Sequence, residues 1–179
     1  LVHKQSKGQP GILHKINNLY FDRIAAMEFA VRADDGKSTK MFESADIVLV
    51  GISRTSKTPL SIYLSHHGYK VANLPLVKGV AVPPEIETLD QSKFVGLTID
   101  PEALFEIRQQ RIKNLGSSKS DGEYASMEGI LEEIDYAEKI FNSHKRWPVF
   151  NVTGKALEEI ASEIVRIFED RRMRKAEKN

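Results

Sequence analysis

The sequence of 179 residues contains no cysteine, which excludes disulfide scaffolds, thiolate nucleophiles and zinc sites built from cysteine. It also lacks an excess of either charge, since 26 lysines and arginines against 25 aspartates and glutamates leave a formal net charge of +1. This balance gives no reason to expect nucleic acid or a membrane surface as a partner. No apolar run approaches the roughly 20 residues of a membrane span, and no signal-peptide pattern opens the chain. We therefore expect a soluble, cytoplasmic protein.

The composition predicts one packed domain. Hydrophobic residues make up 41% of the sequence, and its length falls within the roughly 100–200 residues usual for a domain. Residues 1–18 hold no hydrophobic period and are interpreted as a lead-in or the remnant of a missing N-terminal domain. The domain is expected over residues 19–170, followed by a charged tail over residues 171–179 that frays.

Helices and strands are predicted to alternate along this domain, because short apolar runs alternate with apolar residues at helical spacing. Strands are expected over residues 47–50, 69–76, 94–99 and 148–152, and helices over residues 19–33, 60–67, 101–114, 127–141 and 157–168. The first helix is inferred from the spacing of Leu19, Ile24, Met27 and Val31. The order predicts a three-layer α/β domain with a mainly parallel sheet.

The loop after the first strand carries the clearest functional signal, because ligands of parallel sheets bind beyond the carboxyl ends of the strands. It reads Gly51-Ile52-Ser53-Arg54-Thr55-Ser56-Lys57-Thr58. Three of the four fixed positions of the phosphate-loop (P-loop) pattern G-x-x-x-x-G-K-S/T match, and Ser56 replaces the second glycine. Successive backbone N–H groups that end on a helix N-terminus suit phosphate oxygens. The alternative is an ordinary polar loop capped by serine or threonine.

Lys57 is predicted to contact the terminal phosphates, and the Thr58 hydroxyl to lie where a magnesium ion bridges phosphates. A second metal ligand could be Asp100, which follows a strand as the aspartate of a Walker B motif does, although its fit as a helix N-cap explains it without chemistry. Asp34 and Asp35 could supply a general base, but Asp-Asp-Gly is also a plain turn, and the turn is favoured.

Two arginines occupy unexpected positions on the helix over residues 101–114. Leu104, Ile107 and Ile112 define its apolar face, and at 100° per residue Arg108 and Arg111 fall inside that arc. Guanidinium groups on such a face need partners. A bound phosphate or a protein phosphosite would serve. The alternative, of equal weight, is that the arginines pair with carboxylates at the sheet edge or extend past the rim of the apolar surface.

The residues around the loop closely resemble a known family, the pyruvate, phosphate dikinase regulatory proteins, whose relatives act on phosphoenolpyruvate synthetase. The resemblance extends from Tyr20 to Phe168. It is carried by the runs Ala45–Leu64 and Gly68–Val77, by Ala26–Ala30 with Asp34-Asp35-Gly36, by Val95–Thr98 with Ile107–Gln109 and Arg111, and by Trp147–Val149 with Val152-Thr153.

This resemblance implies a bifunctional enzyme. Family members use ADP to phosphorylate a threonine of the dikinase, which inactivates it, and remove that phosphate with inorganic phosphate to give pyrophosphate. They are usually longer, with an additional N-terminal domain, and a homodimer is a family expectation. The implied partner is therefore pyruvate, phosphate dikinase or phosphoenolpyruvate synthetase, and the implied ligands are ADP, inorganic phosphate and Mg²⁺.

By the same resemblance, the loop from Gly51 to Thr58 binds ADP, and Lys57 is catalytic. Arg108 and Arg111 become candidates for binding inorganic phosphate or the phosphothreonine, with Arg108 also placed in the catalytic set. Arg54 is a further candidate for one phosphate. Asp35 is favoured over Asp34 and Asp100 as the base that takes the threonine proton.

Two other functions fit the loop alone. The chain could be an ATP-dependent P-loop kinase of a small molecule, or a module that senses a nucleotide without turnover. The choice of donor separates the first from the regulatory enzyme. Nucleotide binding without phosphate transfer would identify the second.

Overall fold

A computed structural model of the chain describes residues 12–34, 39–115 and 124–177. Asp35, the favoured base, lies outside the described residues. Six α-helices, two short 3₁₀ helices and four strands are formed in this part of the chain. The helices are α1 Ile12–Arg32, α2 Thr39–Ser44, α3 Lys57–His66, α4 Pro101–Leu115, α5 Met127–Ser143 and α6 Leu157–Ala176, with η1 Pro84–Thr88 and η2 Gln91–Lys93. The strands are β1 Ile47–Gly51, β2 Val71–Pro75, β3 Phe94–Thr98 and β4 Val149–Asn151.

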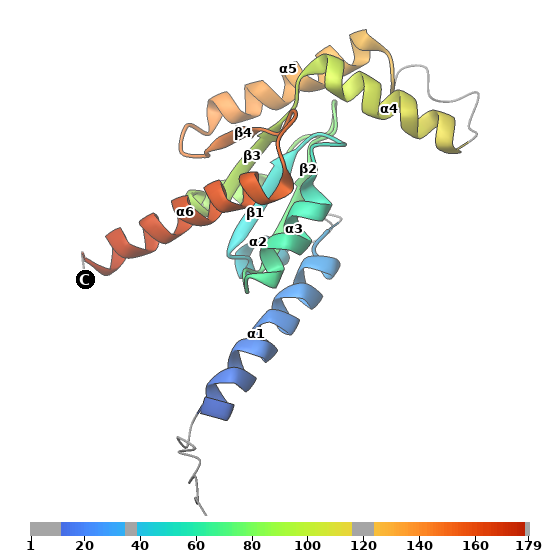
Figure 1. Cartoon of the computed structure of the whole chain (residues 1–179). Helices are drawn as coiled ribbons and strands as arrows, with labels where there is room; N and C mark the ends of the chain where they lie inside the picture. The colour runs from blue at the N-terminus through green and yellow to red at the C-terminus, as the bar shows by residue number, and fades with distance from the viewer. Residues whose placement is uncertain (1–11, 35–38, 116–123, 178–179) are drawn as a thin grey trace, which may run out of the picture.

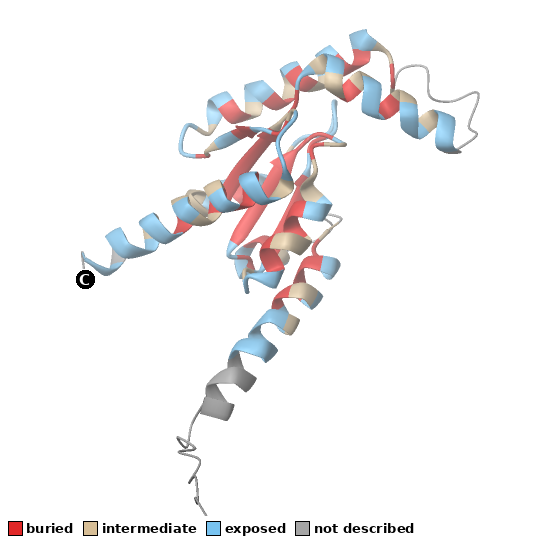
Figure 2. Cartoon of the chain, viewed as in Figure 1, coloured by how far each residue is buried: buried red, intermediate tan, exposed pale blue. Residues whose placement is uncertain are grey.

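The four strands form one sheet in the order β2-β1-β3-β4, and every pair is parallel. The predicted strands and their parallel arrangement are therefore confirmed. All five residues of β1 are buried, as expected for a central strand covered on both faces. Figure 2 shows this buried centre continuing through the neighbouring strands. The loop with the phosphate-binding pattern thus starts from the middle of the sheet.

Helices cover both faces of the sheet and complete the predicted three layers (Figure 1). On one face α3 packs on β1 and β2, with α6 and α1 beside it. On the other face α5 packs on β3, and α4 packs on α5. Within the described part of the chain, no helix is long and apolar enough to cross a membrane.

Helix α1 buries a different face from the one that its largest apolar residues mark. Leu19 and Val31 are 62% and 67% exposed, and Ile24 and Met27 are half-buried. The buried residues are Ala26, Phe29, Ala30 and Ala33. Alanines let α1 approach α3 closely, but they contribute little to a hydrophobic pattern. The spacing of the larger apolar residues therefore indicated the helix correctly, although these residues do not form its buried face.

Two helices are longer than predicted. Helix α1 begins at Ile12, inside the expected lead-in, because residues 12–18 contain no proline or glycine that would break it. Helix α6 continues to Ala176, inside the expected charged tail. Its Arg171 side chain donates to the backbone oxygens of Ser92 at 2.5 Å and Arg146 at 3.3 Å, which holds that part of the helix against the domain.

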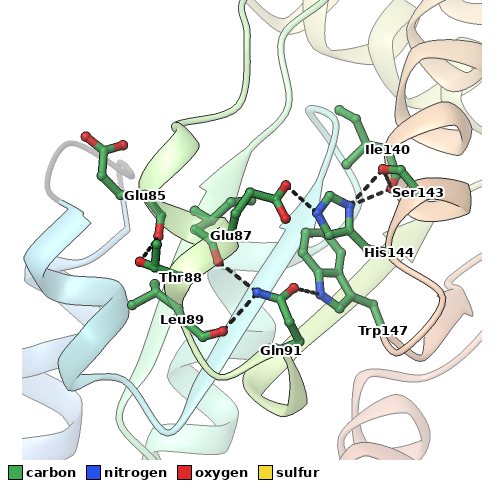
Figure 3. Close-up of polar contacts among 10 residues, drawn as sticks. Glu85, Glu87, Thr88, Leu89, Gln91, Ile140, Ser143, His144 and Trp147 are labelled. Atoms are coloured by element: carbon green, nitrogen blue, oxygen red, sulfur yellow. Dashed lines mark hydrogen bonds and ion pairs between the residues drawn. The ribbon is translucent and has the colours of Figure 1, made fainter.

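An aromatic cluster lies at the amino ends of β3 and β4, and Figure 3 shows the polar contacts of two of its members, His144 and Trp147. The Trp147 ring stacks on Phe94 with centroids 4.8 Å apart and on His144 at 4.0 Å. The Trp147 Nε1 group donates to Gln91 Oε1 at 2.9 Å, and His144 Nε2 lies 2.9 Å from a Glu87 carboxylate oxygen. Trp147 is only 4% exposed and belongs to the hydrophobic core.

Candidate functional site

Gly51 ends β1 and starts the loop, and its neighbours leave no room for a side chain. A Cβ atom at this position would lie 2.6 Å from the Leu97 carbonyl oxygen and 2.8 Å from Thr55 Oγ1. Thr55 itself is fully buried and donates to the Ile52 carbonyl oxygen at 2.9 Å. The start of the loop is therefore held tightly against β3, which fixes where the remainder of the loop emerges.

The loop keeps a backbone shape that usually requires glycine. Arg54 and Ser56 have φ values of 71° and 61°, in the left-handed region. This conformation costs roughly 1–2 kcal/mol for a residue with a Cβ atom. Ser56 stands where the phosphate-loop pattern has its second glycine, so the serine adopts the glycine conformation at that position and carries its strain.

The N-terminus of α3 opens directly from this strained loop. The Ser56 side chain makes no capping hydrogen bond, and the Thr58 hydroxyl donates to Asp34 Oδ1 at 2.8 Å. An ordinary loop capped by serine or threonine is therefore not what the structure shows. The first-turn N–H groups of a helix have no intrahelical partner, and they offer hydrogen bonds and a positive dipole end to an anion.

The Lys57 ammonium lies inside the curve of the loop. Its Nζ atom donates to the carbonyl oxygens of Gly51 at 2.8 Å and Ile52 at 2.7 Å. Burial lowers the pKa of Lys57 from 10.5 to about 8, and the nearby Asp34 carboxylate opposes part of this shift. A largely buried cation without a direct carboxylate partner favours an anionic ligand.

Asp34, just beyond the C-terminal end of α1, is brought to the loop by contacts distant in sequence. Its Oδ1 atom accepts hydrogen bonds from Thr58 Oγ1 and from the Asn73 side-chain amide. Asp34, one of the three aspartates considered as the base, thus lies beside Thr58.

A cavity of about 520 Å³ lies between the loop, α4 and the end of β2. Its lining includes the loop residues Ser53, Arg54, Ser56, Lys57 and Thr58, together with Asp34, Pro59, Pro75, Leu76, Val77 and Ile107. Five of the eight predicted nucleotide-binding residues therefore face one cavity. The other three, Gly51, Ile52 and Thr55, are buried and shape the backbone behind it.

Arg108 is fully buried and pairs with a carboxylate, one of the two alternatives left open by the sequence. Its guanidinium donates to both oxygens of Glu133 at 2.9 and 2.7 Å and to the Tyr124 carbonyl at 2.7 Å. Arg111, in contrast, is exposed, and so is Ile107 at 41%. The expectation that both arginines face the core is therefore wrong for Arg111, because the buried stripe of α4 follows Leu104 and Arg108 and bypasses Ile107.

Asp100 occupies the predicted position before α4 but is turned to other partners. Its Oδ1 atom accepts from the Asn151 side-chain amide at 2.7 Å, and its backbone N–H donates to Thr153 Oγ1 at 2.8 Å. It is absent from the lining of the loop cavity.

Asn73 and Glu133 were not identified from the sequence. Asn73 gave one usable signal, since it is a polar residue in the middle of an apolar strand and is only 1% exposed. Glu133 lies in a run of surface carboxylates on α5 and gave none. Both are joined to their partners by contacts across 25 or more residues.

The fold and the loop at the carboxyl end of β1 define the class of protein. It is a parallel α/β domain whose central strand ends in a lysine-containing loop at a helix N-terminus. The chain belongs to the kinase/pyrophosphorylase family, because a sequence model of that family matches residues 1–165.

Curated relatives support the same placement and confirm the resemblance. A relative named as a pyruvate, phosphate dikinase regulatory protein from Bdellovibrio bacteriovorus is 54% identical over 165 residues, covering 92% of this chain and 58% of the relative. One of the same name from Alkaliphilus metalliredigens is 52% identical over 167 residues, covering 92% and 59%. A relative from Oryza sativa subsp. indica, named as chloroplastic, is 48% identical over 168 residues, covering 94% and 36%. The chain spans less than two thirds of the length of these relatives.

Proposed function

We propose that this chain carries the nucleotide site of a bifunctional regulatory enzyme. The enzyme phosphorylates a threonine of pyruvate, phosphate dikinase or phosphoenolpyruvate synthetase with ADP, and removes that phosphate with inorganic phosphate. Support comes from the kinase/pyrophosphorylase family and from relatives named for regulation of the dikinase. Because the chain covers only part of those relatives, their substrates and partners are part of this proposal.

The observation that carries the proposal is the half-buried Lys57 ammonium at the N-terminus of α3. The ammonium is held by two loop carbonyl oxygens, and the adjoining cavity of about 520 Å³ is within the size range of small-molecule sites. Phosphoryl transfer depends mainly on alignment and on neutralising charge. Lys57 and Arg54, which both line the cavity, supply positive charge for this.

The two reactions balance without any further reactant. In the first reaction the threonine oxygen forms a bond to the β-phosphorus of ADP, the bond from that phosphorus to the bridging oxygen breaks, and AMP leaves. In the second, separate reaction inorganic phosphate attacks the phosphothreonine phosphorus, the threonine oxygen leaves, and pyrophosphate forms. The threonine proton goes to a base in the first reaction and returns in the second.

Magnesium fits the residues at the mouth of the loop. Mg²⁺ prefers oxygen ligands and is usually held by one or two carboxylates together with substrate phosphates. Within the described residues there is no group of three or more histidine, aspartate or glutamate side chains that could hold a metal ion. Thr58 would hold the ion, which when bound neutralises phosphate charge.

A second cavity of about 410 Å³ adjoins the first and shares Ser53, Leu76 and Val77 with it. Arg108 lines this second cavity, so we propose it as the site of inorganic phosphate or phosphothreonine. Arg111, one turn along α4 and exposed, remains a proposed second phosphate ligand. Because Glu133 already engages Arg108, an anion there must compete with this carboxylate. Asp35 follows Asp34 in the chain and remains the proposed base.

Two further features are proposed on the family alone. These are a homodimer and a cytoplasmic location; the relative from rice is named as chloroplastic.

Calorimetric titration of ADP and ATP with magnesium tests the nucleotide site. We expect tighter binding of ADP than of ATP, and a loss of ADP binding in Lys57→Ala. The matched control is Lys139→Ala, which removes an exposed lysine on α5 and should bind as the original protein does. A preference for ATP would favour the small-molecule kinase. Tight ADP binding with no transfer to the dikinase would favour the nucleotide sensor.

A further inference from the structure

Asp34, Thr58, Ser61 and Asn73 form a connected group of polar side chains at the edge of the loop cavity, here called the Asp34 cluster. The four residues come from the end of α1, from α3 and from β2. Hydrogen bonds join them all to one another, directly or through Asn73.

Asn73 is the fixed centre of the cluster. It pairs with Leu49 in the register of β2 and β1, and its side chain is 1% exposed. Its backbone N–H donates to the Ala33 carbonyl at 3.0 Å, which ties the end of α1 to the strand. Its side-chain amide donates to Asp34 Oδ1 and lies 3.5 Å from Ser61 Oγ. Asn73 thus determines where the Asp34 carboxylate lies.

Only one oxygen of the Asp34 carboxylate accepts hydrogen bonds from described residues. Thr58 Oγ1 and the Asn73 amide both donate to Oδ1, and among the described residues no hydrogen bond reaches Oδ2. Asp34 is half-buried and lines the loop cavity. A carboxylate oxygen is therefore available beside the hydroxyl proposed to bind magnesium.

We propose that Asp34 supplies the carboxylate on the magnesium side of the nucleotide site, in place of Asp100, and that Asn73 is a positioning residue for it. The inference rests on the proposed function, because the ion arrives with ADP. Nucleotide sites of the phosphate-loop type pair the loop hydroxyl with an aspartate at the metal. Here the aspartate that contacts that hydroxyl precedes β1 in the chain.

Asp100 lacks both features that distinguish Asp34. Its carboxylate accepts from Asn151, and it does not line the loop cavity. Asp34 touches Thr58 directly at 2.8 Å.

The charge of Asp34 gives the proposal a specific signature. A carboxylate next to the phosphates of ADP repels them when no cation is present and attracts the ion when one is. Removal of the charge should therefore strengthen the binding of metal-free ADP and weaken the binding of ADP with magnesium. A residue with a purely structural role would weaken both.

The test is calorimetric titration of ADP, in magnesium and in EDTA, into the full chain and into Asp34→Asn. The asparagine oxygen can still accept from Thr58 and Asn73, so the variant removes charge while keeping the hydrogen bonds. We expect the ratio of the ADP dissociation constant in EDTA to that in magnesium to fall by about tenfold or more in Asp34→Asn. Asp100→Asn is the matched control and should leave this ratio unchanged.

Asn73→Leu tests the positioning role with the same readout. The leucine has a similar size and no amide, so we expect the magnesium dependence of ADP binding to weaken by about 10–100-fold. Ser61→Ala removes the more distant partner of that amide and should leave the dependence unchanged. A thermal unfolding curve for each variant shows whether the domain is folded, and Asn73→Ser provides a second variant if the leucine prevents folding.

The outcomes separate the two proposals. ADP binding that requires Lys57, with a magnesium dependence unchanged in Asp34→Asn, overturns this inference and leaves the proposed function standing. Loss of the magnesium dependence of ADP binding in Asp100→Asn also overturns the inference about Asp34. No ADP binding to the original protein overturns both.

Discussion

The two ends of the sheet are built differently. At the amino end Trp147 is stacked between two rings, and its ring N–H group is hydrogen-bonded. At the carboxyl end Arg54 and Ser56 are in the left-handed region and the Lys57 ammonium is buried against two carbonyl oxygens. Asn73 Oδ1 there is also buried, with no hydrogen-bond partner among the described residues.

This contrast separates stability from function within one sheet. Strain and unsatisfied polar groups cost free energy, and folded proteins retain them mainly where a ligand or a reaction uses them. The amino end should therefore respond to mutation in stability alone, whereas the carboxyl end should respond in ligand binding.

The largest expected loss of stability comes from the amino end. Trp147→Ala removes a buried ring that stacks on Phe94 and His144, and we expect the free energy of unfolding to fall by about 3–5 kcal/mol. Chemical denaturation measures this change. ADP affinity of the fraction that remains folded should be unchanged, and Trp147→Phe should recover part of the stability. A specific loss of ADP affinity in Trp147→Phe would contradict the division between the two ends.

The buried charge of Lys57 should make stability depend on pH. The pKa of Lys57 is about 8 in the folded chain and 10.5 ordinarily, so between these values the unfolded chain binds more protons. Stability should therefore rise with pH across this interval, by about 3 kcal/mol relative to Lys57→Met. Urea denaturation of both proteins from pH 7 to pH 10.5 measures the difference. Parallel pH profiles would show that Lys57 keeps an ordinary pKa.

Gly51→Ala should affect both properties. The added Cβ atom meets the Leu97 carbonyl oxygen and Thr55 Oγ1, so we expect a loss of about 1–3 kcal/mol and a displaced loop that binds ADP poorly. Gly79→Ala is a useful control, because its Cβ atom would meet nothing, although its φ of 82° adds backbone strain. Unchanged ADP affinity in Gly51→Ala would show that the start of the loop can move without consequence.

Ser56→Gly should have the smallest effect and the opposite sign. Glycine adopts a φ of 61° without the strain that serine carries, and we expect a gain of up to about 1 kcal/mol with ADP binding retained. Thermal unfolding and calorimetry measure the two quantities. A loss of ADP affinity would mean that the Ser56 hydroxyl contacts the ligand, a role that a glycine cannot fill.

The sequence predicted the features that depend on neighbouring residues. The buried strand β1 and the loop after it follow from a continuous apolar run and a local pattern. The helix α1 was predicted, but its buried face could not be identified from the sequence, because Ala26 and Ala30 pack closely without a strong hydrophobic signal. The prediction that Arg111 faces the core was wrong, because the angle between residues on a helix shows which of them are buried only when the centre of the buried face is known.

The remaining site features depend on contacts between distant segments. Asp34 meets Asn73 across 39 residues, and Arg108 meets Glu133 across 25. No local spacing encodes these pairs, since they arise from the way α1 and α5 pack around the sheet. The aspartate next to Thr58 could therefore be recognised only in the folded chain.

Transfer of radioactive phosphate from ADP to protein tests whether the chain is an ADP-dependent kinase. The chain would be incubated with pyruvate, phosphate dikinase and ADP carrying a radioactive β-phosphate, or with ATP carrying a radioactive γ-phosphate. We expect label on a dikinase threonine with ADP and not with ATP, release of AMP, and recovery of the label as pyrophosphate after addition of inorganic phosphate. Label from ATP alone, or tight ADP binding with no label on the dikinase, would contradict this expectation.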